Sequence, residues 1–581
     1  MTQNNPLYIG LDLSTQQLKA AVINQNLQTL DIAKVEFEVD LPKYKTKKGV
    51  YQNGKEIVAP VAMWLDAIDL VFERLSQNKR VDMSHIQGIS GACQQHGTVF
   101  WNDKAANLLN GLTQSNAHKT SLAEHLAESL AWKLSPNWQD HSTEEECQLF
   151  EATVGGKNQL AQLTGSKAHH RFSGPQILKV KRRMSTVYEA TKRISLVSSF
   201  VASVLAGKLL NIERSDVCGM NLWDINTQGW NEDLLALLDS SSDKSDIKKK
   251  LGPIEMVNRP MASVSKYFVN KYGLNPDCRI LPFTGDNSGT ILSLPLEAND
   301  VIVSLGTSTT ALVVTENYAP SSIYHIFNHP IDPKSYMGML CYCNGSLARE
   351  MVRDQVNQKF KISDKSWDKF NEISMNGVPL GLSELENGAI EYKLGFYFPL
   401  GEIIPSVSPV TRRVVINNKD NHTSAVIENI KDGKWQIPTD DVVAILESQA
   451  LSIRMRLRSM MTTTNKLPQR VYFVGGASNN DVICKIMARV LKPNEGSYKL
   501  DMADACVIGA ASKAVHGCEI ADTKDSSKQP SWNEFFKGRW NTELQIVEPW
   551  KSEDEQTNIT YQSINWDNVL EQFELAEAQL K

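Results

Sequence analysis

Two short apolar runs, each followed at once by a polar turn, restrict the folds open to this chain more than any other feature. The first run, residues 278–283, predicts a strand that ends at a Thr-Gly turn, and Asp286 and Asn287 follow directly. The second run, residues 301–305, opens into the hydroxyl-rich glycine turn 306–310. Glycine suits such turns because it adopts backbone angles that other residues avoid. The pattern places an acid and a polar turn at the ends of two strands, although two ordinary strand-to-turn junctions remain the alternative.

The N-terminal segment predicts a β-hairpin with a polar tip. A strand over 7–12 ends in Asp12, a tight turn follows over 13–17, and a second strand covers 18–23. Such a turn can direct successive N–H groups into one concavity, which suits phosphate oxygens. The carboxylate of Asp12 could hold a magnesium ion directly or through water. A plain hairpin with a surface aspartate is the alternative.

Two further strand ends carry groups suited to small ligands. The predicted strand 86–93 runs into Gln94-Gln95-His96-Gly97, where grouped polar side chains suit a hydroxylated ligand. A structural turn with a solvated His96 is the alternative. The predicted strand 470–474 is followed by Gly475-Gly476-Ala477 and a helix from Asp481. Glycines let the backbone approach a flat ligand, and a helix N-terminus favours anionic groups.

Three segments predict helices. Apolar residues recur at helical spacing between residues 58 and 80. The apolar stretch 194–206 is too short to span a bilayer and predicts a buried helix. A third helix is expected to begin with Ser142 as its N-cap and Glu145 at the third helical position.

Composition narrows the class of protein. The chain has 581 residues, a net charge of −5 and nine scattered cysteines. This length predicts more than one domain, and this charge gives no sign of a nucleic-acid or membrane-surface protein. The cysteine spacing does not match a zinc site or a disulfide framework. The first residues lack the features of a signal peptide, so we expect a cytoplasmic protein.

Four motifs together carry a resemblance. Asp-x-Ser-Thr at 12–15, Gly-Asp-Asn at 285–287, Gly-Thr-Ser-Thr at 306–309 and Gly-Gly-Ala-Ser at 475–478 occur in this order. The ordered set resembles the FGGY family of carbohydrate kinases, within the sugar kinase, actin and heat-shock ATPase superfamily. The intervening pieces resemble the eukaryotic D-xylulose kinases of that family, and the resemblance runs from about residue 7 to about residue 515. These pieces are Cys93-Gln-Gln-His-Gly97, Asn137-Trp-Gln-Asp-His-Ser-Thr143, Leu163-Thr-Gly-Ser166 and Gly219-Met-Asn-Leu222.

The resemblance implies an α/β fold of two ribonuclease H-like lobes with a central ligand cleft. Residues 1–292 would form the N-terminal lobe, which binds sugar and carries the first phosphate loop. Residues 293–520 would form the C-terminal, nucleotide-binding lobe, and residues 521–581 an extension of unknown role.

The resemblance also implies a role for individual residues. Asp286 would be the general base, and Asp12 would contact magnesium. The sugar-contact positions are Gln95, His96, Arg171, Asp286 and Asn287. The nucleotide and phosphate positions are Ser14, Thr15, Gln16, Gly306, Thr307, Ser308, Thr309, Trp367, Gly475, Gly476, Ala477 and Asn480. Lys167 stands where relatives often have arginine, and Gln95 stands where many bacterial members have methionine.

The implied activity is ATP- and Mg²⁺-dependent phosphorylation of D-xylulose to D-xylulose 5-phosphate. The implied partners are this sugar and ATP, with no nucleic acid or membrane, in a monomer or homodimer. One alternative is a kinase of the same family that acts on ribulose, glycerol or gluconate. A second is an actin-like or chaperone-like ATPase, which would give no reason for the polar groups at Gln95, His96 and Arg171. A third is a catalytically inactive sugar sensor, which would need the loss of an acid that is present at Asp286.

Overall fold

The computed structural model describes residues 5–384, 386, 390–418, 435–501, 503–540, 544–549 and 564–580. Contacts divide the chain into two units. The first unit comprises Met1–Leu296, Pro320–Met337 and Asp504–Asn541. The second comprises Glu297–Ala319, Gly338–Ala503 and Thr542–Lys581. Each unit therefore contains segments that are distant in sequence.

A seven-stranded mixed sheet organises the first unit, in the order β14–β15–β6–β1–β2–β3 with β16 beside β6. Strands β1, β2 and β3 form an antiparallel meander, whereas β6 runs parallel to β1, β15 and β16. The strands are β1 (Leu7–Leu13), β2 (Gln17–Asn24), β3 (Thr29–Glu36), β6 (Ile86–Cys93), β14 (Ala262–Ser263), β15 (Arg279–Ile280) and β16 (Thr284–Gly285). Every residue of β1 is buried, as expected of a central strand that is covered on both faces.

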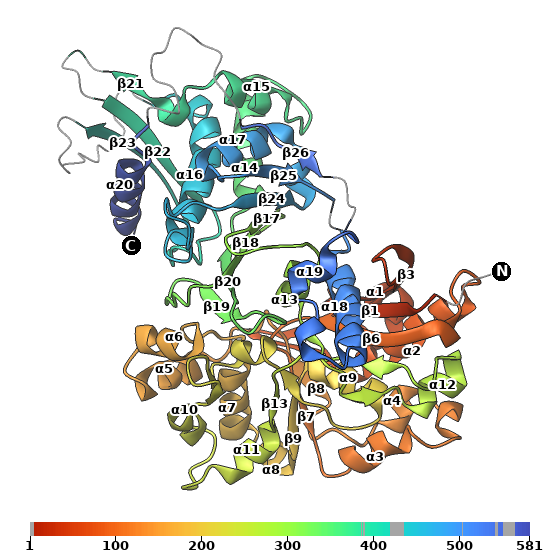
Figure 1. Cartoon of the computed structure of the whole chain (residues 1–581). Helices are drawn as coiled ribbons and strands as arrows, with labels where there is room; N and C mark the ends of the chain where they lie inside the picture. Colours follow the sequence, from red (N-terminus) through yellow and green to blue (C-terminus); the bar gives the residue numbers. More distant parts are fainter. Residues whose placement is uncertain are drawn as a thin grey trace. The chain divides into compact units, whose positions relative to one another are not determined.

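Helices from both ends of the sequence cover this sheet. The predicted helix at 58–80 is α2 (Val61–Gln77), and its apolar residues form part of the main core. The predicted buried helix at 194–206 divides into strand β9 (Arg193–Leu196) and the fully buried helix α9 (Val197–Ala206). Helix α18 (Ala505–Asp522) lies against β1 and β6, as Figure 1 shows. A Cβ atom at Gly10 of β1 would lie 2.5 Å from the backbone nitrogen of Ala511 in α18, so glycine permits this close packing.

The rest of the first unit consists of shorter elements. Its further helices include α3 (Ala105–Gly111), α4 (Leu122–His125), α5 (Glu144–Thr153), α6 (Lys157–Thr164), α7 (Ser173–Arg183), α8 (Ser185–Ala190), α10 (Glu232–Ala236), α11 (Ser245–Leu251), α12 (Lys266–Tyr272), α13 (Asp286–Ile291) and α19 (Trp532–Phe536). One small sheet has three strands, β4 (Tyr51–Asn53), β5 (Glu56–Pro60) and β8 (Leu134–Pro136). Two-stranded sheets join β7 (Thr98–Trp101) to β9, β10 (Ile212–Glu213) to β13 (Ile254–Glu255), and β11 (Trp223–Asp224) to β12 (Gly229–Trp230). Strand β19 (His325–Asn328) belongs to the segment Pro320–Met337 of this unit.

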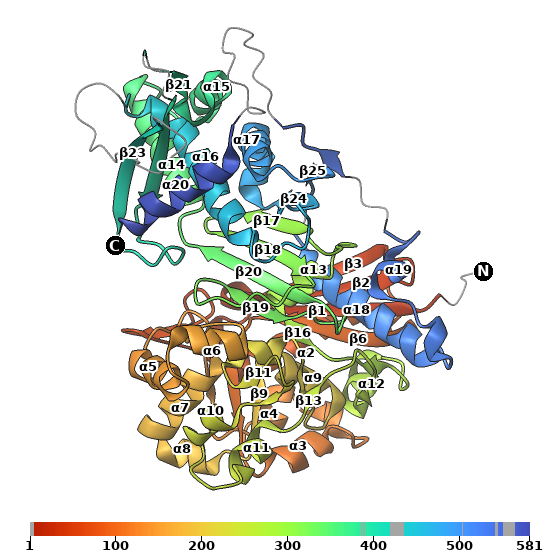
Figure 2. The same cartoon turned by 60° about the vertical axis from the view of Figure 1, so that its left-hand side comes forward.

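The second unit has its own mixed sheet, in the order β20–β18–β17–β24–β25–β26. Strand β24 is parallel to β17 and β25, and Figure 2 shows β17, β18 and β24 side by side. The strands are β17 (Val301–Leu305), β18 (Thr309–Thr315), β20 (Tyr336–Tyr342), β24 (Arg470–Val474), β25 (Gly496–Lys499) and β26 (Gln545–Ile546). A second sheet joins β21 (Ser383–Glu384), β22 (Ile390–Phe398) and β23 (Val410–Asn418). The helices are α14 (Ser346–Lys359), α15 (Asp368–Asn376), α16 (Thr439–Leu457), α17 (Asp481–Leu491) and α20 (Trp566–Ala578).

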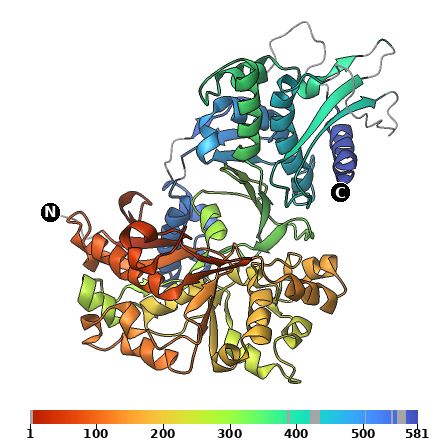
Figure 3. The ribbon, with the colours of Figure 1, turned by 180° about the vertical axis from the view of Figure 1, so that it is seen from behind.

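The last described helix, α20, is anchored in the second unit. Phe573 is buried against Phe396 of β22, with ring centroids 5.0 Å apart, and Glu577 pairs with the buried Arg456 of α16. The helix therefore runs alongside the strands of the second sheet, as the view from behind in Figure 3 shows.

The expected α/β class with two lobes is confirmed. The units differ from the expected boundaries, because the first unit runs to Leu296 and also takes in residues 320–337 and 504–541. The described residues beyond 520 are divided between the two units: α19 belongs to the first unit and α20 to the second. In the part of the chain that the structure describes, no helix combines the length and hydropathy needed to cross a membrane.

Candidate active site

The carboxyl ends of three neighbouring parallel strands meet at one edge of the first unit's sheet. In β1, Asp12 is paired in register with Ala92 of β6, and in β16, Gly285 is paired with Cys93 of the same strand. The residues that follow these strand ends therefore gather at one place. In open α/β sheets, ligands bind outside the carboxyl ends of the strands.

Asp286 is the first residue of α13 at this edge, and it is half-buried. One carboxylate oxygen accepts hydrogen bonds from the backbone N–H of Asn287 at 2.8 Å and from the side-chain amide of Asn287 at 3.0 Å. The amide of Asn287 also donates to Gln95 at 3.1 Å. Burial raises the pKa of Asp286 to about 7, with the carboxylate of Asp12 adding to the effect and the Asn287 N–H opposing it. A carboxylate with a pKa near neutrality suits a general base.

Asp12 and the hairpin tip lie at the same sheet edge. Asp12 is buried and accepts a hydrogen bond from the Ser14 hydroxyl at 2.8 Å. Burial raises its pKa, and hydrogen bonding to Ser14 opposes this shift. Thr15 and Gln16 form the remainder of the predicted tip, and Thr15 accepts a hydrogen bond from the indole N–H of Trp138 at 2.8 Å. The tip is therefore fixed by a residue from the 137–143 segment.

His96 presents one ring nitrogen as an acceptor. Its backbone has a φ of 72°, and the ring is buried and stacked on Phe172 at a centroid distance of 4.4 Å. Nδ1 lies 3.0 Å from the carbonyl oxygen of Gly219. A carbonyl can only accept, so Nδ1 carries the hydrogen and Nε2 keeps its lone pair. Burial, followed by the nearby charge of Arg171, holds the pKa of His96 well below its ordinary value. A Cβ atom at residue 219 would lie 2.7 Å from Nδ1, so this approach requires glycine.

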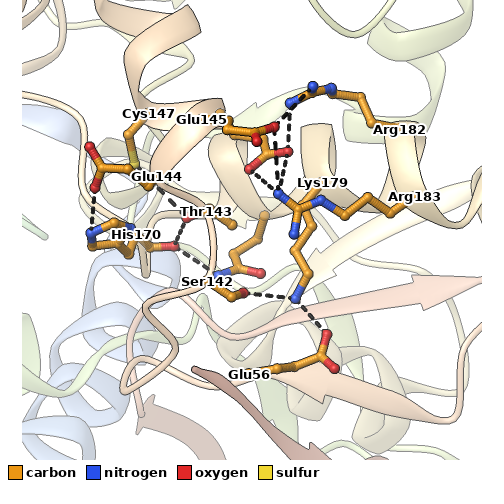
Figure 4. A network of polar contacts seen from close by, with 12 residues as sticks. Glu56, Ser142, Thr143, Glu144, Glu145, Cys147, His170, Lys179, Arg182 and Arg183 are labelled. Carbon is orange, nitrogen blue, oxygen red and sulfur yellow. Dashed lines mark hydrogen bonds and ion pairs between the residues drawn. The ribbon is translucent and has the colours of Figure 1, made fainter. Parts of the chain in front are cut away.

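The loop that carries Arg171 is tied to its surroundings through the preceding residue. The backbone carbonyl of His170 accepts hydrogen bonds from Thr143 and Gln176, each at 2.8 Å. The ring of His170 lies 3.2 Å from the carboxylate of Glu144 (Figure 4). Arg171 therefore leaves a main chain that is held from both the 137–143 segment and α7.

Helix α7 is in turn fixed to the same segment by the buried Lys179. Its ammonium group donates to Glu56 of β5 at 2.5 Å and to the Ser142 hydroxyl at 2.9 Å (Figure 4). Ser142 also donates to Asp140 at 2.7 Å, so its hydroxyl is engaged away from the helix. The prediction of Ser142 as an N-cap is therefore wrong: α5 begins at Glu144, and the preceding Thr143 makes no side-chain cap.

The nucleotide positions of the second unit line a cavity of about 850 Å³. Its walls come from the β17–β18 turn, the start of α15 and the turn between β24 and α17. Six of the predicted residues line it: Gly306, Thr307, Trp367, Gly476, Ala477 and Asn480. Pockets of 300–1,000 Å³ suit small molecules and cofactors.

The base of this cavity is shaped by local contacts. Gly475 has a φ of 88°, which turns the chain into the 3₁₀ segment Gly476–Asn479. Asn480 caps α17 through Val482 and donates its amide to Asn371 at 2.9 Å. The guanidinium of Arg353 lies over the ring of Trp367 at 4.7 Å. One face of this indole is thereby covered by a cation.

Three predicted positions do not line the large cavity. Ser308 belongs to the β17–β18 turn, and Gly475 lies next to Leu305, whose backbone a Cβ atom at residue 475 would approach within 3.1 Å. Thr309 is buried and lines a separate cavity of about 30 Å³ instead. Of the four predicted residues in this turn, only Gly306 and Thr307 therefore line the large cavity.

Several residues were not singled out from the sequence. Ser346, Glu350 and Asn371 also line the cavity of about 850 Å³, and none belongs to the motifs that carried the resemblance. Trp138 lies within the piece 137–143 that carried the resemblance, and this position was the signal by which the sequence could have indicated it. His325, which contacts Arg171 at 3.0 Å, comes from a segment with no motif at all.

Asp12 is the expected magnesium contact. The described residues contain no group of three or more histidine, cysteine or carboxylate side chains that could hold a metal ion on their own. Magnesium bound with nucleotides keeps several waters and takes one or two carboxylates together with phosphate oxygens. A single carboxylate at a strand end, beside the polar hairpin tip, fits that mode of binding.

Comparison with known proteins gives consistent matches over most of the chain. The N-terminal domain of the FGGY family of carbohydrate kinases matches residues 7–134 and 134–293, and the C-terminal domain matches residues 301–518. The chain is 44% identical to the xylulose kinase of Saccharomyces cerevisiae over 536 residues, which cover 87% of each chain. It is 47% identical to a probable D-xylulose kinase A of Aspergillus fumigatus over 528 residues, covering 89% and 90% of the two chains.

Solved structures with the same fold include the xylulose kinase of Rhodospirillum rubrum, with a TM-score of 0.73 at 15% identity and 99% coverage of both chains. The gluconate kinase of Lactobacillus acidophilus gives a TM-score of 0.72 at 15% identity, covering 99% and 98% of the two chains. At these identities the likeness establishes the fold alone. Together with the two domain matches and the sequence relatives, it leads to one conclusion: the chain belongs to the FGGY family of carbohydrate kinases.

Proposed function

We propose that this chain transfers the γ-phosphoryl group of ATP to D-xylulose, giving ADP and D-xylulose 5-phosphate. The relatives at 44–47% identity that are named xylulose kinases support this choice of sugar. The observation that carries the chemistry is the half-buried Asp286, with a pKa of about 7, at the shared carboxyl edge of β1, β6 and β16.

Asp286 acts as the general base. The 5-hydroxyl oxygen of the sugar attacks the γ-phosphorus, its proton passes to the Asp286 carboxylate, and the bond to the β-phosphate oxygen breaks to release ADP. Phosphoryl transfer leaves the protein mainly positioning and charge stabilisation to supply. Gln95 and Asn287 hold each other beside Asp286, and the Nε2 lone pair of His96 and the guanidinium of Arg171 supply an acceptor and donors for sugar hydroxyls.

Nucleotide binding uses the cavity of the second unit. The indole of Trp367 stacks on the adenine, and the 475–480 turn approaches the adenine and ribose closely. Asp12 would hold magnesium together with phosphate oxygens, and the ion would neutralise charge on the phosphates. The Ser14–Gln16 tip and the 306–309 turn contact the phosphates. Both units are therefore needed for transfer.

The test is a coupled assay of ADP release with D-xylulose, D-ribulose, glycerol and gluconate as acceptors. A site that pairs with sugar hydroxyls discriminates strongly against analogues that lack them. We expect D-xylulose to give the highest kcat/KM. A preference for glycerol or gluconate would contradict the sugar assignment, and ADP release that is independent of any acceptor would indicate an ATPase. The cytoplasmic location and the monomeric or homodimeric state stay predictions, testable by fractionation and light scattering.

A further inference from the structure

The guanidinium of Arg171 is contacted by a histidine from a distant part of the sequence. Nη2 of Arg171 lies 3.0 Å from Nε2 of His325, and Nδ1 of His325 lies 2.8 Å from the hydroxyl oxygen of Ser166. His325 belongs to β19, within the segment Pro320–Met337 that packs in the first unit. The C-terminal family domain spans this same segment. A residue from the second half of the sequence therefore reaches a predicted sugar-contact residue in the first.

The partners of His325 determine its tautomer. A guanidinium has only donors and keeps its charge at every pH relevant to proteins, so Nε2 of His325 must supply a lone pair. The ring hydrogen is then on Nδ1, which donates to the Ser166 hydroxyl. Ser166 is itself fully buried. Burial, with the charge of Arg171 next in size, holds the pKa of His325 well below its ordinary value, in agreement with a neutral ring.

Aromatic neighbours fix the plane of this ring. His325 is buried, and its centroid lies 4.6 Å from that of His169 and 5.5 Å from that of Phe172. Phe172 also stacks on His96, which is one of the predicted sugar-contact residues. Phe172 therefore packs against both histidine rings: that of His96, and that of His325, which accepts the hydrogen bond from Arg171.

We propose that His325 is a positioning residue of the sugar site, whose neutral ring fixes the direction of the Arg171 guanidinium toward the acceptor sugar. This inference rests on the proposed function, because it assigns Arg171 to the sugar. The main chain before Arg171 is held through the His170 carbonyl, so His325 acts on the far end of a side chain that is anchored at its near end.

The kinetic test compares substitutions at two histidines of the same segment. His325→Phe keeps a flat, buried ring but removes the acceptor for Arg171, whereas His325→Gln restores an acceptor oxygen. His329 is equally buried at 3% exposure, and its Nδ1 accepts from the backbone N–H groups of Ile331 and Asp332. His329→Phe is therefore the matched control: it removes a buried imidazole without touching the Arg171 contact.

We expect His325→Phe to lower kcat/KM for D-xylulose about tenfold or more, mainly through KM for the sugar, because a hydrogen bond to a charged group is lost. KM for ATP should stay within about twofold, and His325→Gln should recover most of the loss. His329→Phe should leave both KM values near those of the wild type. Unchanged sugar kinetics in His325→Phe, or an equal loss in His329→Phe, would overturn the proposal.

A second measurement depends on neither turnover nor the folding of the phenylalanine variant. In protein labelled with ¹⁵N-histidine and free of substrates, the His325 signals, assigned by their absence in His325→Gln, should show a protonated Nδ1 and an unprotonated Nε2 at neutral pH. Arg171→Ala should shift the Nε2 signal. A protonated Nε2, or no response to Arg171→Ala, would overturn the proposal. Failure of the proposed function would instead appear as wild-type protein that does not phosphorylate D-xylulose.

Discussion

At the residue scale, Asp286 carries the largest share of the proposed chemistry. Asp286→Asn keeps the shape of the side chain and its place beside Asn287, but it removes the base. General-base assistance contributes about 10²–10⁴-fold in rate, so we expect kcat to fall by at least about 10²-fold. D-xylulose binding should weaken much less. Steady-state kinetics together with thermal melts would measure this.

The exposed Asp277, which lies just before β15, provides the matched control. Asp277→Asn makes the same chemical change in the same unit and should retain wild-type kcat. If Asp286→Asn were well folded with near-normal turnover, the base assignment would be wrong. If it lost thermal stability together with activity, the residue would serve mainly to hold its loop.

The pKa of Asp286 also predicts the pH dependence. Burial raises this pKa to about 7, so the carboxyl group is protonated below that pH and cannot accept the sugar proton. We therefore expect kcat/KM for D-xylulose to fall as pH decreases below about 7, approaching tenfold per pH unit as expected for one essential ionisation. The profile of Asp286→Asn should lack this limb. A wild-type profile that is flat from pH 8 to pH 5.5 would contradict a base with this pKa.

A further prediction concerns Trp367 and the binding of the nucleotide. Its ring lines the cavity of the second unit, with Arg353 over the ring. Stacking of a base on an aromatic side chain is worth about 1–3 kcal/mol by alanine substitution. Trp367→Ala should therefore raise KM for ATP by about 5- to 150-fold, while Trp367→Phe retains much of the affinity. An equal rise in KM for D-xylulose would show general damage instead.

At the element scale, strand ends could be predicted because their sequence signal is local. An apolar run that stops at a polar turn marks Asp12, Gln95 and Asp286 without any knowledge of long-range contacts. The start of α5 could not be predicted in this way, because Ser142 matches the capping pattern but its hydroxyl is bound to Asp140 and Lys179. Local propensity is overridden when a distant residue offers a stronger partner.

Helix α20 gives an element-scale prediction about stability. Phe573 is buried at 1% exposure against Phe396, whereas Leu575 on the same helix is 45% exposed. Phe573→Ala should destabilise the second unit by about 3–5 kcal/mol, as expected for a large-to-small change in a core. Leu575→Ala should change stability by less than about 0.5 kcal/mol.

Urea unfolding, monitored by fluorescence and by resistance of the second unit to proteolysis, would measure the stability of both variants. Equal stability of Phe573→Ala and Leu575→Ala would mean that α20 does not support the second unit.

At the scale of the whole molecule, neither unit is one continuous stretch of the chain: each contains segments that are separated in sequence by parts of the other. The motifs predicted two lobes, but they did not predict that residues 320–337 and 504–541 belong to the first. The contacts responsible join residues more than 150 positions apart, such as Gly10 with Ala511 and Arg171 with His325. Packing of this kind leaves no periodic pattern in the sequence, so His325 could be found only in the structure.

The proposed reaction joins the γ-phosphorus of ATP to the 5-oxygen of D-xylulose. The most direct test is nuclear magnetic resonance of the product made from ¹³C-labelled D-xylulose and ATP by the wild-type protein with magnesium. We predict one phosphorylated sugar, with phosphorus coupling at C5, formed in equal amount to ADP. Coupling at C1, or ADP accompanied only by inorganic phosphate, would contradict it.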